Sequence, residues 1–340
     1  MNTRSLFVSP QRAWVRILAN ALAVLVVLGL LVFFLGPKNE FGPDTPTARE
    51  AAPTQLNELD NWLAQSEAKV SNLKPGTAKG IVWARADKQA TEWAVVYVHG
   101  FSASRLETAP VANDVAKALG ANVFYTRLTG HGLPGEAMGE ATAQDWLADT
   151  LEAVRIGKTL GRKVLLISCS TGSTLATWLA TSPDAALVDA HVFISPNFGL
   201  KNKAAELVNG HWGQRIAYAV TGPNVTYTSD NPRDAQGWTQ SYPTKALFPM
   251  LALVKKVRDS DLSRFQTPVL ALYSEQDETV EPNETKAALA RFGAAQKKLD
   301  AVDFSQSKGQ HVLAGEIRDP QAVAPMVERI LTWVKTLPSP

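Results

Sequence analysis

Residues 165–173 read Leu165-Leu166-Ile167-Ser168-Cys169-Ser170-Thr171-Gly172-Ser173, an apolar run that ends in a small-x-Ser-x-Gly sequence. A helix-forming segment, residues 174–180, follows at once. A strand that reverses sharply into a helix holds one serine hydroxyl clear of the backbone, an arrangement called a nucleophile elbow. Such a tight turn leaves room only for small side chains two residues before and two after its apex, and Ser168 and Gly172 meet that condition. The stretch therefore predicts Ser170 as a nucleophile at the end of a strand.

The rest of the chain alternates between strand and helix patterns. Strands are expected at residues 81–83, 93–98, 122–126, 163–168, 191–195, 269–274 and 298–304, and helices at 111–119, 143–160 and 322–334. The run at 93–98 is apolar without interruption, as in a strand covered on both faces. This alternation predicts an α/β fold, in which an open and mostly parallel sheet carries helices on both faces.

One segment, residues 197–265, interrupts the alternation. It contains several aromatic residues and mixed helix signals, and it separates two expected strands. An insertion of this length predicts a cap over the site instead of a plain loop. The expected core then consists of residues 54–196 and 266–340.

The amino-terminal segment at 17–36 is apolar apart from Asn20. About 20 residues at a rise of about 1.5 Å match the hydrocarbon core of a bilayer, about 30 Å thick. Three arginines precede the run, whereas acidic residues follow it. The sequence therefore predicts a single transmembrane anchor with a cytoplasmic tail at 1–16 and a linker at 37–53. The remaining domain is expected outside the cytoplasm, which is the periplasm in a Gram-negative bacterium.

A cleaved signal peptide is the alternative interpretation of this segment. Signal peptides have an apolar stretch of about 7–15 residues followed by a small-x-small cleavage site. The run here is longer, and Pro37 follows it in place of such a site. An uncleaved anchor is therefore the favoured interpretation.

The composition is that of an ordinary globular protein, with 45% hydrophobic and 19% charged residues among 340. A formal net charge of +2 and the absence of a basic stripe argue against a nucleic-acid partner. The single cysteine, Cys169, excludes an internal disulfide framework. No zinc-ligand spacing, phosphate loop or Gly-x-Gly-x-x-Gly sequence occurs, so neither a metal nor a nucleotide cofactor is expected.

A serine nucleophile needs a neighbouring base, which is itself oriented by an acid. In an open parallel sheet, such partners are expected in loops beyond the carboxyl ends of later strands. Asp277 follows the expected strand at 269–274, and His311 follows the one at 298–304. The order Ser, Asp, His is the one found with this kind of elbow. We therefore predict Ser170, Asp277 and His311 as the catalytic set.

Several residues compete with these assignments. Glu275 and Glu278 flank the predicted acid, and Asp303 is another candidate for it. His131, in Thr129-Gly130-His131-Gly132, is the main competitor as base, but it precedes the serine and is expected to brace its loop through hydrogen bonds. Cys169, one residue before the apex, is expected to be buried in the sheet packing. The other histidines are expected to be structural, namely His99, His191 and His211.

Acyl transfer also needs hydrogen-bond donors for the oxyanion that forms on the carbonyl oxygen, and these are commonly two backbone N–H groups. The residue after the nucleophile, Thr171, supplies one in such elbows. The loop that begins at His99-Gly100-Phe101 fits the second, since Gly100 allows a close backbone approach. Phe101 and Thr171 are therefore the predicted oxyanion donors.

With these residues placed, the chain from about 80 to 337 resembles the α/β-hydrolase superfamily, and within it the carboxylesterase and monoacylglycerol-lipase-like group. The resemblance is carried by His99-Gly100-Phe101, Gly130-His131-Gly132, Ser168-x-Ser170-x-Gly172, Asp277 with Val280, and His311. It implies Ser170 as nucleophile, His311 as base and Asp277 as its orienting acid. Ser168 stands where glycine is usual, without effect on that mechanism.

These observations predict a membrane-anchored serine hydrolase that cleaves carboxylic esters through an acyl-enzyme on Ser170, without a cofactor. The aromatic residues of the 197–265 segment favour an acyl or aryl group in an apolar pocket, and a nearby bilayer favours lipid-derived esters. A thioesterase, acyltransferase, peptidase or carbon–carbon hydrolase with the same triad is the main alternative. A non-catalytic anchored binding protein is the other. The sequence does not indicate an oligomeric state.

Overall fold

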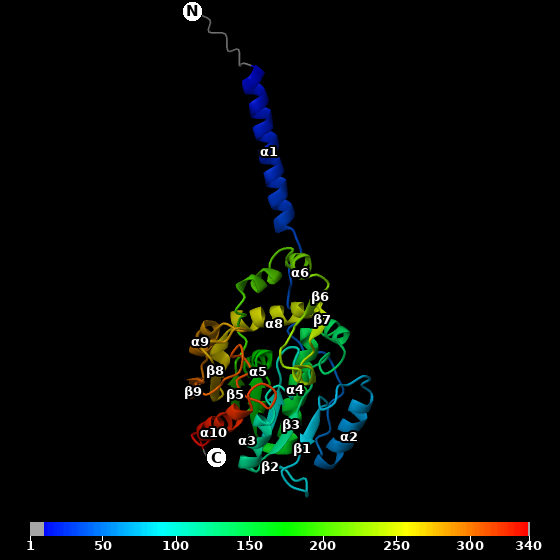
Figure 1. The fold of residues 1–340 in the computed structure, drawn as a ribbon, viewed down its shortest axis with the longest axis vertical. Coiled ribbons are helices and arrows are strands. Elements are labelled where there is room, and N and C mark those ends of the chain that lie inside the picture. The colour runs from blue at the N-terminus through cyan, green and yellow to red at the C-terminus, as the bar shows by residue number, and fades with distance from the viewer. Residues whose placement is uncertain (1–9, 339–340) are drawn as a thin grey trace, which may run out of the picture.

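The central sheet has seven strands in the order β1-β3-β2-β4-β5-β8-β9 (Figure 1). The strands are β1 (Gly80–Val82), β2 (Thr91–Val98), β3 (Asn122–Tyr125), β4 (Gly161–Cys169), β5 (Ala190–Ile194), β8 (Val269–Tyr273) and β9 (Lys297–Ala301). In the computed structural model, which describes residues 10–338, β1 alone pairs antiparallel in this sheet and every other pairing is parallel. The predicted α/β fold with a mostly parallel sheet is confirmed.

Helices cover both faces of the sheet. The helices of the body beyond α1 are α2 (Leu56–Ala68), α3 (Val111–Leu119), α4 (Ala143–Leu160), α5 (Thr171–Thr181), α8 (Leu247–Asp259), α9 (Pro282–Arg291) and α10 (Val323–Val334), and two further helices, α6 (Gly213–Thr221) and α7 (Asp234–Gly237), lie in the 197–265 segment. Alternate residues of a strand point to opposite faces. Accordingly, Val96 of β2 belongs to the core cluster that includes residues of α4, α5 and α8, whereas Val95 belongs to the cluster that includes residues of α3 and α10. Burial on both sides explains the uninterrupted apolar sequence of β2.

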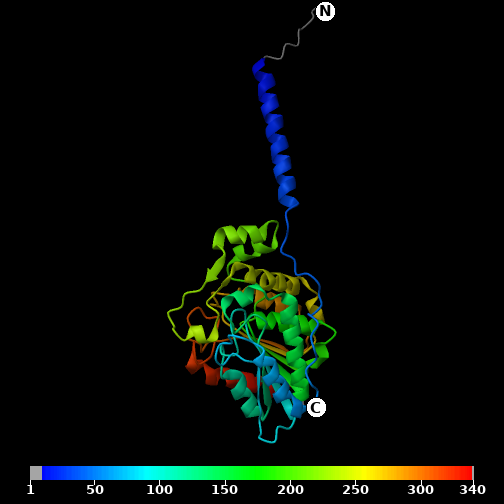
Figure 2. The same ribbon diagram turned by 90° about the vertical axis from the view of Figure 1, so that its right-hand side faces the viewer.

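The segment at 197–265 lies between β5 and β8 in the chain. It contains the 3₁₀ helix η3 (Lys203–Asn209), α6, a small antiparallel pair formed by β6 (Asn224–Thr226) and β7 (Ser241–Pro243), α7 and α8. Figures 1 and 2 show α6 at the end of the body from which the amino-terminal helix projects. The segment therefore stands between that helix and the sheet.

The amino-terminal helix, α1 (Pro10–Phe34), begins before the predicted anchor at 17–36 and ends two residues earlier. Its Trp14–Phe34 portion has 21 residues with a mean hydropathy of 2.8, and none of the portion is buried. By length and composition it is able to cross a membrane, a test that signal sequences also pass. Residues 1–9 of the predicted tail lie outside the described residues.

Contacts fix the foot of α1 on the 197–265 segment. The Trp212 indole donates hydrogen bonds to the carbonyl oxygens of Val32 and Phe33, at 3.2 and 3.1 Å. The Trp212 backbone N–H donates to Pro37 O at 2.8 Å. A Cβ on Gly36 would lie 2.0 Å from the indole nitrogen, so this approach requires glycine. The body therefore contacts both the last turn of α1 and the residues that immediately follow it.

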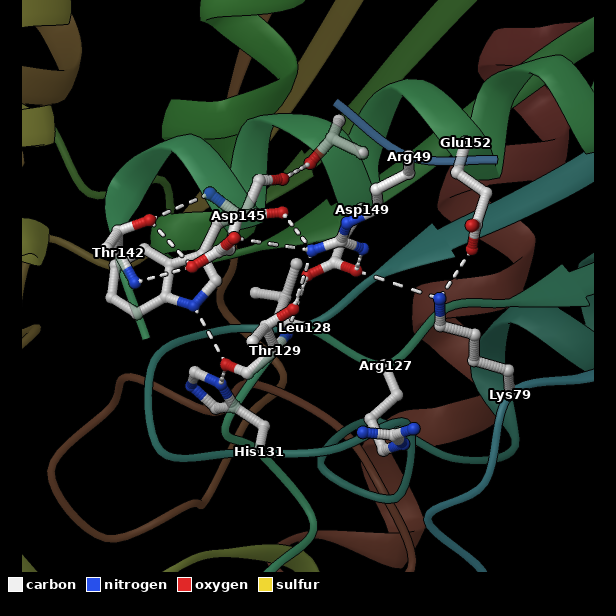
Figure 3. A network of polar contacts seen from close by, with 12 residues as sticks. Arg49, Lys79, Arg127, Leu128, Thr129, His131, Thr142, Asp145, Asp149 and Glu152 are labelled. Carbon is white, nitrogen blue, oxygen red and sulfur yellow. Dashed lines mark hydrogen bonds and ion pairs between the residues drawn. The ribbon is translucent and has the colours of Figure 1, made fainter. Parts of the chain in front are cut away.

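Residues 37–53, predicted as a linker from their composition, have no helix or strand but lie against the body. Arg49 forms an ion pair with Asp149, a buried carboxylate on α4 (Figure 3). Asp149 also accepts hydrogen bonds from Thr129 N–H and Oγ1, at 2.6 and 2.8 Å, and Lys79 Nζ lies 3.7 Å away. Earlier in the segment, Asp44 accepts a hydrogen bond from the Trp178 indole at 2.8 Å. These contacts hold the segment along α4 and α5.

His191→Phe is expected to reduce the acid sensitivity of the fold. His191 in β5 is fully buried, neither ring nitrogen has a hydrogen-bond partner among the described residues, and burial lowers its pKa from 6.5 to about 3. Between those pKa values the unfolded chain binds a proton that the folded chain does not, so the free energy of unfolding falls as the pH falls. The loss is about 2 kcal/mol between pH 8 and pH 5.

Phenylalanine cannot titrate and retains ring packing against Phe193 and Phe265. Urea unfolding of both full-length proteins in detergent, at pH 8 and pH 5, measures the difference. Between pH 8 and pH 5, the free energy of unfolding of the variant should fall by about 2 kcal/mol less than that of the parent. An equal loss in both proteins would show that His191 does not contribute.

Candidate active site

The turn at Ser170 joins the carboxyl end of β4 to α5. Ser170 has φ 51° and ψ −119°, a strained conformation that is typical of nucleophile elbows. Its backbone N–H is satisfied by Ile194 O at 2.9 Å. A Cβ on Gly172 would lie 2.3 Å from Val98 O, so only glycine fits beside β2 there. The sequence requirement for a small residue after the apex thus has a direct steric cause.

Ser168 occupies the other small position without strain on the packing. Its side chain is fully buried, and its hydroxyl lies 3.0 Å from the Ser173 hydroxyl. The hydroxyl that glycine would lack is therefore hydrogen-bonded within the elbow, which explains why serine is accepted here.

The structure brings Ser170, His311 and Asp277 into one hydrogen-bonded chain. His311 Nε2 lies 3.0 Å from Ser170 Oγ, and His311 Nδ1 lies 2.8 Å from Asp277 Oδ2. The other Asp277 oxygen accepts N–H bonds from Thr279 and Val280, at 2.7 and 2.9 Å. Asp277 is only 2% exposed, and as an acceptor it orients the ring so that Nδ1 carries the proton and Nε2 faces the serine.

The loops that carry His311 and Asp277 are tied to each other and to the sheet. Glu278 N–H donates to Gly309 O at 3.0 Å, which joins the loop after β8 to the loop after β9. Ser195 Oγ, just beyond β5, donates to His311 O at 2.5 Å. Since neighbouring parallel strands all end at this edge, residues far apart in sequence meet there.

The competing carboxylates do not meet the imidazole. Asp303 has a side chain that is 83% exposed and pairs with Arg329. Glu275 pairs with Lys286 and accepts a hydrogen bond from the Tyr273 hydroxyl. Glu278 lines the cavity described below and forms no hydrogen bond with His311 among the described residues.

The competing base and thiol have structural surroundings. His131 is fully buried, accepts the Ser102 N–H at Nε2 (3.0 Å), and burial lowers its pKa to about 4. It therefore braces its loop as a neutral ring, as predicted. Cys169 is buried in the sheet packing, also as predicted, and burial raises the pKa of its thiol.

The loop after β2 lies beside the elbow with most of its polar groups occupied. Gly100 N–H donates to Glu107 Oε1 at 2.7 Å, and His99 Nδ1 lies 2.9 Å from Gly100 O. Neither Phe101 N–H nor Thr171 N–H donates a hydrogen bond to any acceptor within residues 10–338. These two N–H groups, which the sequence singles out, are thus free to bind a ligand oxygen.

One residue of this site, Glu107, is not indicated by any sequence pattern. The side chain is only 2% exposed, and burial raises its pKa to about 7. It accepts hydrogen bonds from Gly100 N–H and from the Tyr97 hydroxyl at 2.9 Å. A glutamate in a polar loop is normally exposed to solvent. The sequence therefore did not predict that Glu107 is buried, and only its closeness to the Gly100 loop pointed to the site.

A cavity of about 770 Å³ opens above Ser170. Its apolar lining comes largely from the 197–265 segment and the Gly100 loop, and includes Phe101, Leu200, Trp238, Tyr242, Leu247, Met250 and Val312. Acidic and basic side chains also line it, namely Glu107, Asp230, Glu278, Lys308 and Arg318. Such a volume suits a small organic ligand with a sizeable apolar part. Within residues 10–338, no cluster of three or more His, Cys, Asp or Glu side chains is arranged to hold a metal ion.

Comparisons with known proteins agree with this geometry. The family model described as serine aminopeptidase, S33, matches residues 89–306. A thermostable monoacylglycerol lipase from Bacillus sp. (strain H-257) is 27% identical over 206 residues, which are 60% of this chain and 78% of the lipase.

Two solved structures share the fold at low identity. One belongs to work on LipS and LipT, two metagenome-derived lipolytic enzymes; its TM-score is 0.61 at 20% identity, covering 78% of this chain and 100% of that one. The other is a soluble variant of monoglyceride lipase from Saccharomyces cerevisiae, with a TM-score of 0.60 at 13% identity over 78% and 96% of the two chains. Because the family match runs from β2 through β9, well over half of the chain, this protein belongs to the serine aminopeptidase S33 family of α/β-hydrolases and is a serine hydrolase.

Proposed function

We propose that this protein hydrolyses carboxylic esters of lipid origin through an acyl-enzyme on Ser170. The observation that carries the proposal is the Ser170–His311–Asp277 chain at the base of an apolar-walled cavity. A relative known as a monoacylglycerol lipase supports the choice of esters. The S33 family description leaves peptide bonds as the competing substrate class.

In the proposed first half-reaction, Ser170 Oγ attacks the ester carbonyl while His311 Nε2 accepts the hydroxyl proton. Asp277 stabilises the resulting imidazolium and keeps its ring in place. The imidazolium then protonates the departing alcohol, which leaves the acyl group on Ser170. In the second half-reaction, water attacks the acyl-enzyme with His311 again as base, and the carboxylic acid departs.

The two free N–H groups, of Phe101 and Thr171, serve as the oxyanion donors in this proposal. Donors already in place stabilise the charge that develops on the carbonyl oxygen, and each contributes about 3 kcal/mol to lowering the barrier. Gly100 N–H cannot share the task because Glu107 already occupies it. Phe101 N–H is therefore the proposed donor from this loop.

A substrate panel tests the ester assignment. The full-length protein in detergent would be assayed with p-nitrophenyl esters of graded chain length, a monoacylglycerol, acyl-CoA thioesters and aminoacyl p-nitroanilides. We expect the highest kcat/KM for an ester or monoacylglycerol. Turnover confined to the thioesters or the anilides would overturn the ester assignment while leaving a serine hydrolase.

We further propose that α1 anchors the protein in a membrane with the body outside the cytoplasm. The exposed, apolar Trp14–Phe34 portion has the length of a bilayer crossing. Trp212, at the foot of this helix, is the residue type that favours the membrane–water boundary. Large apolar side chains are also exposed on η3 and α6 beside it, namely Leu207, Ile216, Tyr218 and Val220. Contact with lipid accounts for an apolar surface at this place.

Thiol labelling tests the orientation, since the native Cys169 is buried and should not react. We expect Asp87→Cys, at an exposed position of the body, to react with a membrane-impermeant maleimide in intact cells. Asn2→Cys is the matched control and should react only after permeabilisation. The opposite pattern would reverse the topology, and a mature protein whose mass lacks the amino-terminal segment would identify a cleaved signal peptide.

A further inference from the structure

We infer that Glu107 is a positioning residue for the oxyanion hole, holding the Gly100 N–H so that the next N–H group along the chain, that of Phe101, faces the carbonyl oxygen of the substrate. The inference rests on the proposed function, since it concerns the same site. Glu107 belongs to neither the triad nor the donor pair.

Glu107 contacts the backbone directly before the proposed donor. Gly100 N–H donates to Glu107 Oε1 at 2.7 Å, which fixes the peptide immediately before the proposed donor. On the other side of the same residue, His99 Nδ1 holds Gly100 O at 2.9 Å. The N–H group and the carbonyl oxygen of Gly100 are therefore both held, by Glu107 and His99. These two contacts set the direction in which the following N–H group, that of Phe101, points.

The Glu107 side chain is itself held by hydrogen bonds. Its Oε1 also accepts the Tyr97 hydroxyl at 2.9 Å, and Tyr97 in turn accepts the Thr108 hydroxyl at 2.7 Å. A side chain that is locked by several partners positions its own contact more accurately than a mobile one.

The Glu107 carboxyl group lies beside the nucleophile. A Cβ on Gly100 would lie 3.1 Å from Glu107 Oε2 and 3.1 Å from Ser170 Cβ. Glu107 also lines the cavity above Ser170. A buried carboxyl group is unfavourable in a fold unless it is satisfied or serves the site, and here it is both satisfied and adjacent to the reacting atoms.

The test compares Glu107→Leu, Glu107→Gln and the control Tyr97→Phe in the full-length protein in detergent. Leucine removes the acceptor for Gly100 N–H. Glutamine keeps a carbonyl oxygen, and two donors, Gly100 N–H and the Tyr97 hydroxyl, select the orientation that places it at the Oε1 position. Tyr97→Phe removes the other hydrogen bond to that oxygen and leaves the Gly100 contact intact.

Three quantities are measured: kcat and KM for a short p-nitrophenyl ester, the inhibition constant of a trifluoromethyl ketone, and the midpoint of thermal unfolding. The ketone forms a serine adduct whose oxygen mimics the oxyanion. We expect Glu107→Leu to lower kcat and to lower the affinity for the ketone, each by about 30- to 100-fold, with little change in KM. Glu107→Gln should retain most of the parent's kcat and ketone affinity. Tyr97→Phe removes one support of Glu107 and keeps its Gly100 contact, so it should lower the unfolding midpoint and reduce kcat and ketone affinity by less than about threefold.

Unchanged kcat and ketone affinity in Glu107→Leu would overturn the inference. It would also fail if Tyr97→Phe reduced both as strongly as Glu107→Leu does, because packing would then explain the loss. If the leucine variant does not fold, Glu107→Met, which is longer and equally unable to accept the bond, takes its place. Failure of the proposed function is distinguishable, because then the parent protein would not hydrolyse esters at all.

Discussion

Ser170→Ala is expected to lower kcat for ester hydrolysis by about 10⁴- to 10⁶-fold, because no other group replaces the nucleophile. Among residues 10–338 the only hydrogen-bond partner of the Ser170 hydroxyl is His311 Nε2, so its loss leaves the rest of the elbow intact. The turn itself is held by backbone contacts, including Ser170 N–H to Ile194 O. The variant should therefore fold like the parent and fail in catalysis alone.

Initial rates and labelling by a fluorophosphonate probe measure this effect together. The parent should be labelled, with the probe on the peptide that contains Ser170, and Ser170→Ala should not. Ser173→Ala is a matched control, since that hydroxyl is buried and bonds to Ser168. Ser173→Ala should keep its label and most of its kcat. Labelling that survives Ser170→Ala would place the nucleophile elsewhere.

Asp277→Asn is expected to lower kcat by about 10⁴-fold with little effect on stability. The Asp277 Oδ1 atom accepts two backbone N–H bonds, from Thr279 and Val280, and the amide oxygen of asparagine can take over both. The amide NH₂ then occupies the Oδ2 position, 2.8 Å from His311 Nδ1 in the parent. A donor there forces the proton onto Nε2, and the ring can no longer accept the proton of the Ser170 hydroxyl.

Steady-state kinetics and the thermal unfolding midpoint of the variant check this expectation. Asp303→Asn, a change of the same kind at the competing carboxylate, should leave both unchanged because Asp303 is exposed and distant from the imidazole contacts. A loss below about tenfold in Asp277→Asn would show that the carboxylate does not orient the base.

The alternating apolar patterns predicted the sheet and its helices closely. The expected helices at 111–119 and 143–160 coincide with α3 and α4. The strand at 269–274 is one residue shorter in the structure, as β8. Such agreement is expected where each strand is buried on both faces and each helix on one, because burial then dictates the sequence pattern.

The candidate site was predictable because the turn geometry restricts residue size. Gly172 has no side chain for a steric reason, and a short stretch of sequence displays that requirement. Asp277 and His311 followed from chain order and from their places after strands. Glu107 did not follow, because its burial depends on Tyr97 and Gly100 folding around it, which no local pattern encodes.

The docking of residues 37–53 was equally invisible in the sequence. Pro, Gly and charged residues are typical of linkers, and the pairing of Arg49 with Asp149 joins positions a hundred residues apart. A single long-range ion pair leaves no periodic trace. Composition therefore indicated an absence of regular structure correctly and gave no information on where the segment lies.

Because residues 37–53 lie against the body, they do not act as a flexible linker between α1 and the body. Fully extended, a segment as long as 37–53 would let the body roam up to about 60 Å from the bilayer. In the structure, contact with the body already begins at Pro37, whose carbonyl oxygen accepts the Trp212 N–H at 2.8 Å. If α1 is inserted in a membrane as proposed, this docking keeps the catalytic cavity near the lipid surface. Turnover would then depend on how densely substrate molecules populate the adjoining leaflet and on how quickly they diffuse within it.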